Sequence, residues 1–203
     1  MNESVNSRIE HKITRSKPGQ IFLPSDFKDI GTSAAIRKSL SRLVEQGLIE
    51  RMGQGIYVVP KQDKVFGKTL PSMEELAETL AKKEHVKIMP SGQYALNRVG
   101  LSTQVPMRMV YLTNGNQKRI RIGKSAIVFK STTTKKLAMT GKISSLLFLG
   151  LEELDLEKIS ASDLKKIALL LKKENPQKLK HDLRLAPARV SDFIVKQILN
   201  AES

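Results

Sequence analysis

The chain has 203 residues, of which 40% are hydrophobic, so it can bury one large core or two to three smaller ones. It contains no cysteine, which excludes disulfide bonds, cysteine nucleophiles and thiolate metal sites. Lysine and arginine number 35 against 20 acidic residues, and this net charge of +15 is typical of proteins that bind polyanions.

The sequence carries no signal for export or for membrane insertion. No apolar run approaches the roughly 20 residues that are needed to span a bilayer. Residues 1–12, MNESVNSRIEHK, are polar where a secretion signal needs an apolar stretch. We therefore predict a cytoplasmic protein without a membrane partner.

The first block of the chain, residues 1–62, begins with helical patterning. Apolar residues recur every four positions over about 4–16, which predicts an amphipathic helix. Pro18-Gly19 breaks this pattern, and a short extended run follows. Pro24 then starts a second, short helix.

A third helix and a hairpin complete this block. Thr32 is a good N-cap for a helix over about 33–46. Two β-prone runs follow, and Gly53-Gln54-Gly55 joins them. Helix, short strand, helix, turn, helix and hairpin is the order of a winged helix-turn-helix domain, which is a DNA-binding module.

The outward face of the third helix carries the candidate DNA contacts. At about 100° per residue, its apolar residues fall on one arc and its polar and small residues on the opposite arc. Lys38 and Arg42 can reach phosphates or guanine edges. The candidate DNA-contacting residues, with those of the hairpin, are Ser33, Ala34, Arg37, Lys38, Ser41, Arg42, Arg51 and Gln54. Alternatively, these residues form only the solvated face of a surface helix. The glycine-tipped hairpin that follows the helix favours DNA binding over this alternative.

Residues 63–71 are predicted to be a linker, and residues 72–142 a small basic α+β domain. The sequence Ser-Met-Glu-Glu at 72–75 fits a capping box ahead of an amphipathic helix. A strand at about 86–89 and a short helix after Pro90 follow. The whole chain therefore belongs to the α+β class.

Three β-prone runs follow within residues 108–130, and Asn114-Gly115 separates the first two. Asn-Gly between alternating runs is the strongest local hairpin signal, since a type I′ turn needs positive φ at both positions. We therefore predict a small antiparallel sheet with a second basic surface on its exposed face. The residues of that surface are Lys118, Arg119, Arg121, Lys124 and Lys130.

The excess charge is concentrated in residues 85–142, which hold 11 basic residues and no acidic residue. Such a segment favours a polyanion, because each neutralised phosphate releases condensed counterions. A second DNA-contact surface, an RNA site and a site for an acidic partner are the functional interpretations. A basic surface that only improves solubility is the alternative.

Residues 143–203 are predicted to be helical. The apolar run 143–151 predicts a buried helix, and residues 160–173 predict an amphipathic one. The Asn-Pro pair at 175–176 breaks the helical pattern, and residues 187–200 form a last helix.

The sequence lacks the patterns of an enzyme. Gly123-Lys124-Ser125 resembles the end of a phosphate-binding P-loop, but Lys118 stands where that motif needs glycine. The three histidines lie far apart and without metal-ligand spacing, and no nucleophile elbow is present. We therefore predict no catalytic residues, no metal and no cofactor.

Two motifs resemble a known family. RLVEQGLIERMGQGIYVVP (42–60) resembles the wing region of AbiEi-type antitoxins, the antitoxin half of type IV abortive-infection systems. MPSGQYALNRVGLSTQVPMRMVYLTNG (89–115) is similar to the central motif of the same group, in which a short helix leads into a strand. The resemblance covers roughly residues 5–140.

The resemblance implies a winged-helix repressor that binds inverted repeats in the promoter of its own operon, so its partner is double-stranded DNA. It also implies a C-terminal region that counters a nucleotidyltransferase-type toxin, with or without direct contact. The residues that carry over are Ser33, Arg37, Lys38, Ser41, Arg42, Arg51 and Gln54. The alternative function is a protein- or RNA-binding interaction module that uses the basic middle domain and keeps the winged helix as a scaffold.

Overall fold

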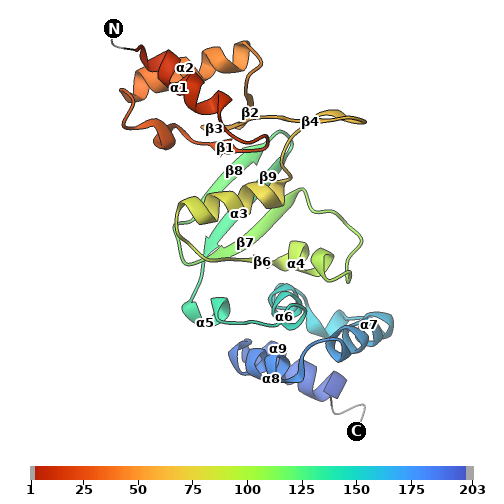
Figure 1. Ribbon diagram of the computed structural model, residues 1–203. Helices are drawn as coiled ribbons and strands as arrows, with labels where there is room; N and C mark the ends of the chain where they lie inside the picture. Colours follow the sequence, from red (N-terminus) through yellow and green to blue (C-terminus); the bar gives the residue numbers. More distant parts are fainter. Residues whose placement is uncertain (1–2, 200–203) are drawn as a thin grey trace. The chain divides into compact units, whose positions relative to one another are not determined.

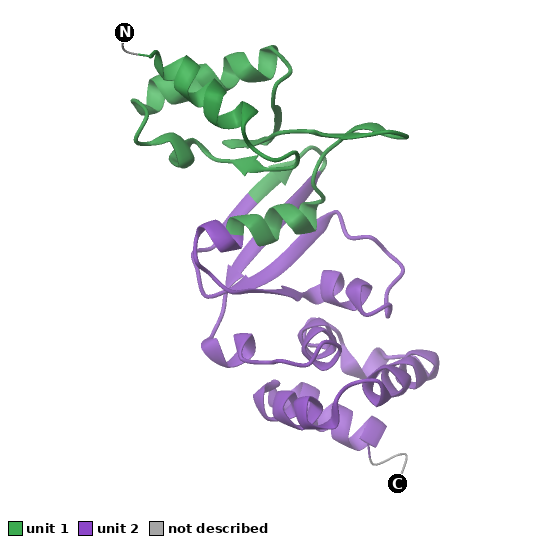
Figure 2. Ribbon diagram, viewed as in Figure 1, with its two compact units in different colours: residues 1–80, 120–124 green, residues 81–119, 125–203 purple. Residues whose placement is uncertain are grey.

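The computed structural model describes residues 3–199 (Figure 1). The chain is a mixed α+β protein with small sheets, as the sequence predicts. It divides into two compact units (Figure 2). Unit 1 combines the chain up to Leu80 with Ile120–Lys124, and unit 2 combines Ala81–Arg119 with the chain from Ser125 onward. The predicted division into blocks 1–62, 72–142 and 143–203 stays a prediction.

Unit 1 begins with helices around a small sheet. The elements are α1 (Val5–Thr14), β1 (Ile21–Phe22), the 3-10 helix η1 (Pro24–Phe27), α2 (Ser33–Glu45), β2 (Glu50–Gly53) and β3 (Ile56–Val58). The strands form an antiparallel sheet in the order β1-β3-β2. The predicted N-cap of α2 is confirmed, because the Thr32 hydroxyl accepts a hydrogen bond from the Ala35 N–H at 3.3 Å. Gly47, at φ +73°, ends the helix.

The core of unit 1 lies between α1, α2 and the sheet. Its buried members are Ile9, Ile13, Phe22, Phe27, Ile36, Leu40, Leu43, Ile49 and Tyr57. The Phe22 and Phe27 ring centroids are 5.4 Å apart. Lys12 ties α1 to η1, because its ammonium donates to the Asp26 carbonyl at 2.7 Å and lies 5.1 Å from the Phe27 ring centroid.

Residues predicted as a linker contain regular structure. β4 (Lys61–Asp63) and β5 (Gly67–Thr69) form an antiparallel hairpin in unit 1. Helix α3 (Met73–Lys83) follows, and its first eight residues up to Leu80 belong to unit 1. The predicted capping box is confirmed, because Glu75 accepts from the Ser72 N–H at 2.7 Å and Ser72 Oγ accepts from the Glu75 N–H at 3.1 Å.

The second sheet is mixed rather than antiparallel. Its strands are β6 (Ile88–Ser91), β7 (Arg108–Thr113), β8 (Lys118–Ile122) and β9 (Ser125–Ser131), in the order β6-β7-β9-β8. β6 pairs antiparallel with β7, but β7 pairs parallel with β9. The short helix α4 (Gly92–Arg98) lies between β6 and β7 in sequence.

The predicted Asn114-Gly115 hairpin is therefore wrong. Neither residue has positive φ, so the pair does not form a type I′ turn. Instead, Asn114 Oδ1 accepts from the Lys87 N–H at 2.7 Å, and Thr113 Oγ1 accepts from the Gly115 N–H at 3.0 Å. These side-chain hydrogen bonds form a different turn. The strand that pairs with β7 is therefore β9 and not β8.

The C-terminal part is helical, as predicted. It contains α5 (Thr134–Leu137), α6 (Ser144–Leu151), the 3-10 helix η2 (Leu156–Lys158), α7 (Ala161–Lys172), α8 (Pro176–Leu185), α9 (Ala188–Ile194) and a π-helical turn (Val195–Leu199). The prediction of a buried helix is confirmed, since Leu147, Phe148 and Leu149 of α6 have no exposed surface. Position 200 of the predicted last helix lies outside the described residues.

The Asn-Pro pair at 175–176 does more than end α7, because it also starts α8. Asn175 Oδ1 accepts from the N–H groups of Gln177 and Lys178 at 3.0 and 3.2 Å. Proline at the first helical position lacks the N–H that would stay unpaired there. Within residues 3–199, no helix combines the length and apolarity needed to cross a bilayer.

Replacing Ser72 by alanine removes the acceptor for the Glu75 N–H at the start of α3. We expect a loss of about 1 kcal/mol in the free energy of unfolding. Urea denaturation followed by circular dichroism measures it, with Glu78→Ala, an exposed change on the same helix, as the control. Equal midpoints for the Ser72→Ala and control variants would contradict the role of the capping box.

Candidate nucleic-acid interface

Helix α2 presents two opposite faces. Its apolar residues Ile36, Leu40 and Leu43 are at most 2% exposed and belong to the core of unit 1. The six candidate contacts on the other face are all exposed: Ser33, Ala34, Arg37, Lys38, Ser41 and Arg42. The separation of the faces follows from the helical period, which the sequence shows directly.

The three basic side chains of α2 are free of partners within the described part of the chain. The side chains of Arg37, Lys38 and Arg42 make no hydrogen bond and no ion pair with any of residues 3–199. Cations on an exposed helix face that form no ion pair keep their charge available for an external anion.

The β2–β3 hairpin places its two candidate residues, Arg51 and Gln54, at the surface. Arg51 is exposed, and its Nε donates to the Gly53 carbonyl at 3.4 Å. Gln54 is exposed at the tip, next to Gly55 at φ +68°. A bulge between Arg51 and Gly53 accompanies the turn.

Residues 120–124 of the second basic surface belong to the same compact unit as α2 and the hairpin. A Cβ on Gly53 would lie 2.8 Å from the Arg121 carbonyl oxygen and 3.1 Å from Ile122 Cδ1. This close approach requires glycine at position 53. It brings the backbone of Arg121 to the hairpin, so exposed Arg121 and Lys124 join the candidate interface.

The five residues of the predicted second surface do not share one exposed face. Side chains alternate along β8, which separates Lys118 from Arg119 and Arg121. Lys118 is half-buried, pairs with Glu84 and lies 4.8 Å from the Phe129 ring centroid.

Acidic residues from outside the segment 85–142 neutralise part of its charge. Lys130 lies 3.5 Å from Glu153, and Lys136 lies 2.5 Å from Glu152. The segment contains no carboxylate of its own, but its positive electrostatic field in the folded chain is weaker than its sequence suggests. Arg119 remains exposed.

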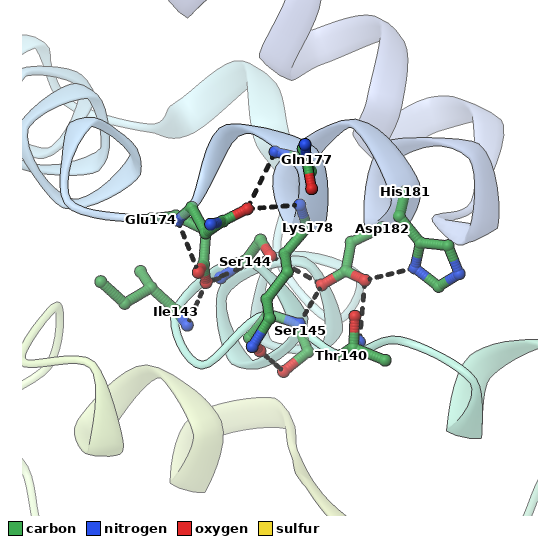
Figure 3. A network of polar contacts seen from close by, with 11 residues as sticks. Thr140, Ile143, Ser144, Ser145, Glu174, Gln177, Lys178, His181 and Asp182 are labelled. Atoms are coloured by element: carbon green, nitrogen blue, oxygen red, sulfur yellow. Dashed lines mark hydrogen bonds and ion pairs between the residues drawn. The ribbon is translucent and has the colours of Figure 1, made fainter.

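Sequence reasoning missed a polar centre in unit 2, built on Asp182 of α8 (Figure 3). The Asp182 carboxylate is fully buried and accepts from the N–H groups of Thr140 and Gly141, both at 2.9 Å. It also accepts from Ser144 Oγ at 2.6 Å, and His181 Nδ1 lies 3.1 Å from its other oxygen.

Glu174, the second carboxylate of this centre, holds the first residues of α6. Its Oε2 accepts from the N–H groups of Ile143 and Ser144 at 2.6 and 3.0 Å. Two carboxylates thus satisfy N–H groups at the start of a buried helix, where the helix dipole also favours negative charge. A Cβ on Gly141 would lie 2.7 Å from an oxygen of each carboxylate, so the turn needs glycine.

This centre has the residue types of a hydrolase triad but not the arrangement. Asp182 lies between Ser144 and His181, so the serine donates to a carboxylate and has no base at its hydroxyl. Ser144 has no exposed surface. The arrangement fixes the start of α6 against α8.

Burial raises the pKa of Asp182, but hydrogen bonds from Ser144, Thr140, His181 and Gly141 outweigh it, so the pKa lies below its ordinary value. Burial likewise raises the pKa of Glu174, and the N–H groups of Ile143, Ser144 and Asn175 lower it further than burial raises it. Both carboxyl groups are therefore ionised in the folded chain near neutral pH.

A cleft of about 360 Å³ lies in unit 2 beside the 101–107 loop, and Gln93, Leu101, Ser102, Asp163 and Lys166 are among its lining residues. The loop is held by Asn97, whose Nδ2 donates to the Ser102 and Gln104 carbonyls at 3.2 and 3.0 Å. Val105 and Met107 project from this loop with 79% and 60% of their surface exposed. Across residues 3–199, no three histidine or acidic side chains cluster in a way that could hold a metal ion.

The profile of a family of unknown function, DUF6088, matches residues 8–179. The chain belongs to this family. The matched region contains all eight candidate DNA contacts and Glu174, whereas Asp182 and the last helices follow it. No curated protein matches the chain.

Acidification should destabilise the polar centre. The folded-state pKa values of Asp182 and Glu174 are lowered, so their stabilising contribution is fully present above about pH 4.5 and is lost as pH falls through the lowered values. Urea denaturation at a series of pH values measures the free energy of unfolding. A free energy that stays constant from pH 6 down to about pH 3 would contradict this assignment.

At neutral pH, Asp182→Asn should lower the free energy of unfolding by about 3 kcal/mol, because an amide cannot accept from every donor that faces the carboxylate. The free energy of unfolding of this variant should also depend less on pH in the acidic range. Asp192→Asn, which changes an exposed residue of α9, is the matched control.

Proposed function

We propose that the protein is a DNA-binding transcriptional regulator and that unit 1 binds the duplex as a winged helix-turn-helix. The observation that carries the proposal is the basic face of α2, whose side chains pair with nothing among residues 3–199, together with the glycine-tipped β2–β3 hairpin that follows it. The order α1, β1, η1, α2, β2, β3 supports the same interpretation, since it runs helix, strand, helical turn, helix and hairpin.

The dimensions of α2 suit a major groove. Thirteen residues give a helix about 20 Å long, and a groove about 12 Å wide accepts one α-helix. Ser33 and Ala34 keep the first turn small, so the helix can approach the bases closely. Lys38 and Arg42, one turn apart, are then in position for guanine edges or for phosphates.

The β2–β3 hairpin and residues 120–124 supply contacts beside the groove. Arg51 and Gln54 suit the backbone or the minor groove, and Arg121 and Lys124 add positive charge in the same compact unit. Such side chains position a protein on the duplex without reading its sequence.

We further propose that the regulator is the autoregulating antitoxin of a type IV abortive-infection system, which represses its own operon through inverted repeats. This part rests on the resemblance of residues 42–60 and 89–115 to AbiEi-type antitoxins. The functional partner would be a nucleotidyltransferase-type toxin encoded next to it. The protein would act by binding and not by catalysis.

A second candidate function is a protein-binding role for unit 2. The exposed Val105 and Met107 beside the 360 Å³ cleft favour it, because apolar side chains next to a cleft suit a partner surface. Co-purification of the adjacent gene product with the wild type, and its loss with Met107→Lys, would support this role.

Lys38→Ala and Arg42→Ala should each weaken binding to the protein's own upstream DNA by about 1–3 kcal/mol if the side chains touch base edges. Fluorescence anisotropy with this duplex and with an unrelated duplex measures the difference. An equal loss on both duplexes would assign the two residues to phosphates.

The matched control is Lys173→Ala, which removes one exposed positive charge from unit 2. It should leave the dissociation constant nearly unchanged. Absence of wild-type binding to the upstream region at moderate salt would overturn the proposed function.

A further inference from the structure

The β4–β5 hairpin exposes two large apolar side chains at its tip. Val65 and Phe66 each have 82% of their surface exposed. Figure 1 shows the hairpin as a thin arm that leaves the helices of unit 1. Neither side chain contributes to the buried core of unit 1, so packing within that core does not explain them.

The shape of the tip is set by its own hydrogen bonds. Asp63 Oδ1 accepts from the N–H groups of Val65 and Phe66 at 2.8 and 2.9 Å. These bonds lower the pKa of Asp63, with the Phe66 N–H as the larger cause. Gly67 completes the turn at φ +70°. The two apolar side chains are thus presented from a preorganised turn.

The base of the arm is attached beside the proposed DNA-reading elements. Lys68 lies 3.4 Å from Glu50 of β2, and a Cβ on Gly47, just after α2, would lie 3.9 Å from the Lys68 ammonium. On the other strand, Lys61 lies 3.7 Å from Glu75 of α3. All of these contacts lie within unit 1.

The free charge of the arm suits a polyanion. Of its three lysines, Lys61 and Lys68 pair with Glu75 and Glu50 outside the arm, and Asp63 is the one acidic residue of the arm. The Asp63 carboxylate is occupied by the backbone of the tip. Lys64 is exposed beside the tip and pairs with no acidic group among residues 3–199.

We infer that the β4–β5 hairpin is a DNA arm whose Lys64 contacts a phosphate and whose Phe66, with Val65, wedges between base steps next to the site read by α2. Apolar wedges on basic proteins enter the minor groove in this way and partly unstack the bases. Strands of three residues and a turn extend the arm by about 10–15 Å, or roughly three to four base pairs. This inference rests on the proposed function.

The test uses the upstream duplex with 2-aminopurine, a fluorescent adenine analogue that brightens when it is unstacked, placed at successive flanking positions. Wild-type protein should raise the fluorescence at one or two adjacent steps. Phe66→Ala should abolish this rise and weaken affinity about tenfold, whereas Phe66→Leu should keep most of both. Leu169→Ala, another change of an exposed apolar side chain, in unit 2, should behave as the wild type.

The outcomes separate the arm from the proposed function. In one outcome, wild-type protein binds the duplex and binding depends on Lys38 and Arg42, but no base step brightens and Phe66→Ala binds equally well. This outcome would overturn the DNA arm and leave the proposed function standing. If wild-type protein does not bind the duplex at all, both proposals fail.

Two further results would also overturn the arm as a DNA wedge. One is a lower sedimentation mass for Phe66→Ala with unchanged DNA binding, which would assign the tip to a second copy of the chain. The other is binding of the wild type, but not of Phe66→Ala, to vesicles of phosphatidylserine and phosphatidylcholine. A circular dichroism melt checks that each variant is folded.

Discussion

Burial of one face of α2 is the constraint on which the proposed interface depends. Ile36, Leu40 and Leu43 are almost completely removed from solvent. Burying each such side chain contributes roughly 1.5–3 kcal/mol, which exceeds what an exposed ion pair offers. The helix therefore cannot rotate to bring its lysine and arginine side chains to acidic partners within the protein. Lys38 and Arg42 face outward because the other side of the helix is required by the core.

The distribution of charge in the folded chain differs from its distribution along the sequence. Lys118, Lys130 and Lys136 meet carboxylates that lie outside the acid-free segment. Arg121 and Lys124, in contrast, belong to unit 1 together with α2. The fold thus reduces the free positive charge of unit 2 and increases that of unit 1. Both effects shift free positive charge toward unit 1.

Local signals made much of the fold predictable. The helical period located α2 and its buried face, Thr32 and the Ser72–Glu75 box located two helix starts, and the apolar run 143–151 predicted a buried helix. Each of these signals acts between residues at most a few positions apart, so a single sequence contains the whole of it.

The features that the sequence did not reveal depend on distant partners. The Asn114-Gly115 pair has the composition of a hairpin turn, but β7 pairs with β9 and not with β8. Asp182 and Gly141 are 41 residues apart, and no local pattern marks an aspartate that will cap another helix. The position of residues 120–124 beside Gly53 is likewise a tertiary contact. The eight candidate contacts are exposed as predicted.

Amide hydrogen exchange of the whole chain, with and without its upstream duplex, tests the proposed interface most directly. We predict slower exchange at residues 32–42, 51–55 and 120–124 with this duplex, and a smaller effect with a scrambled duplex of equal length. Unchanged exchange in α2 at saturating DNA, or slowing confined to α7, α8 and α9, would contradict the assignment of unit 1 as the DNA-binding unit.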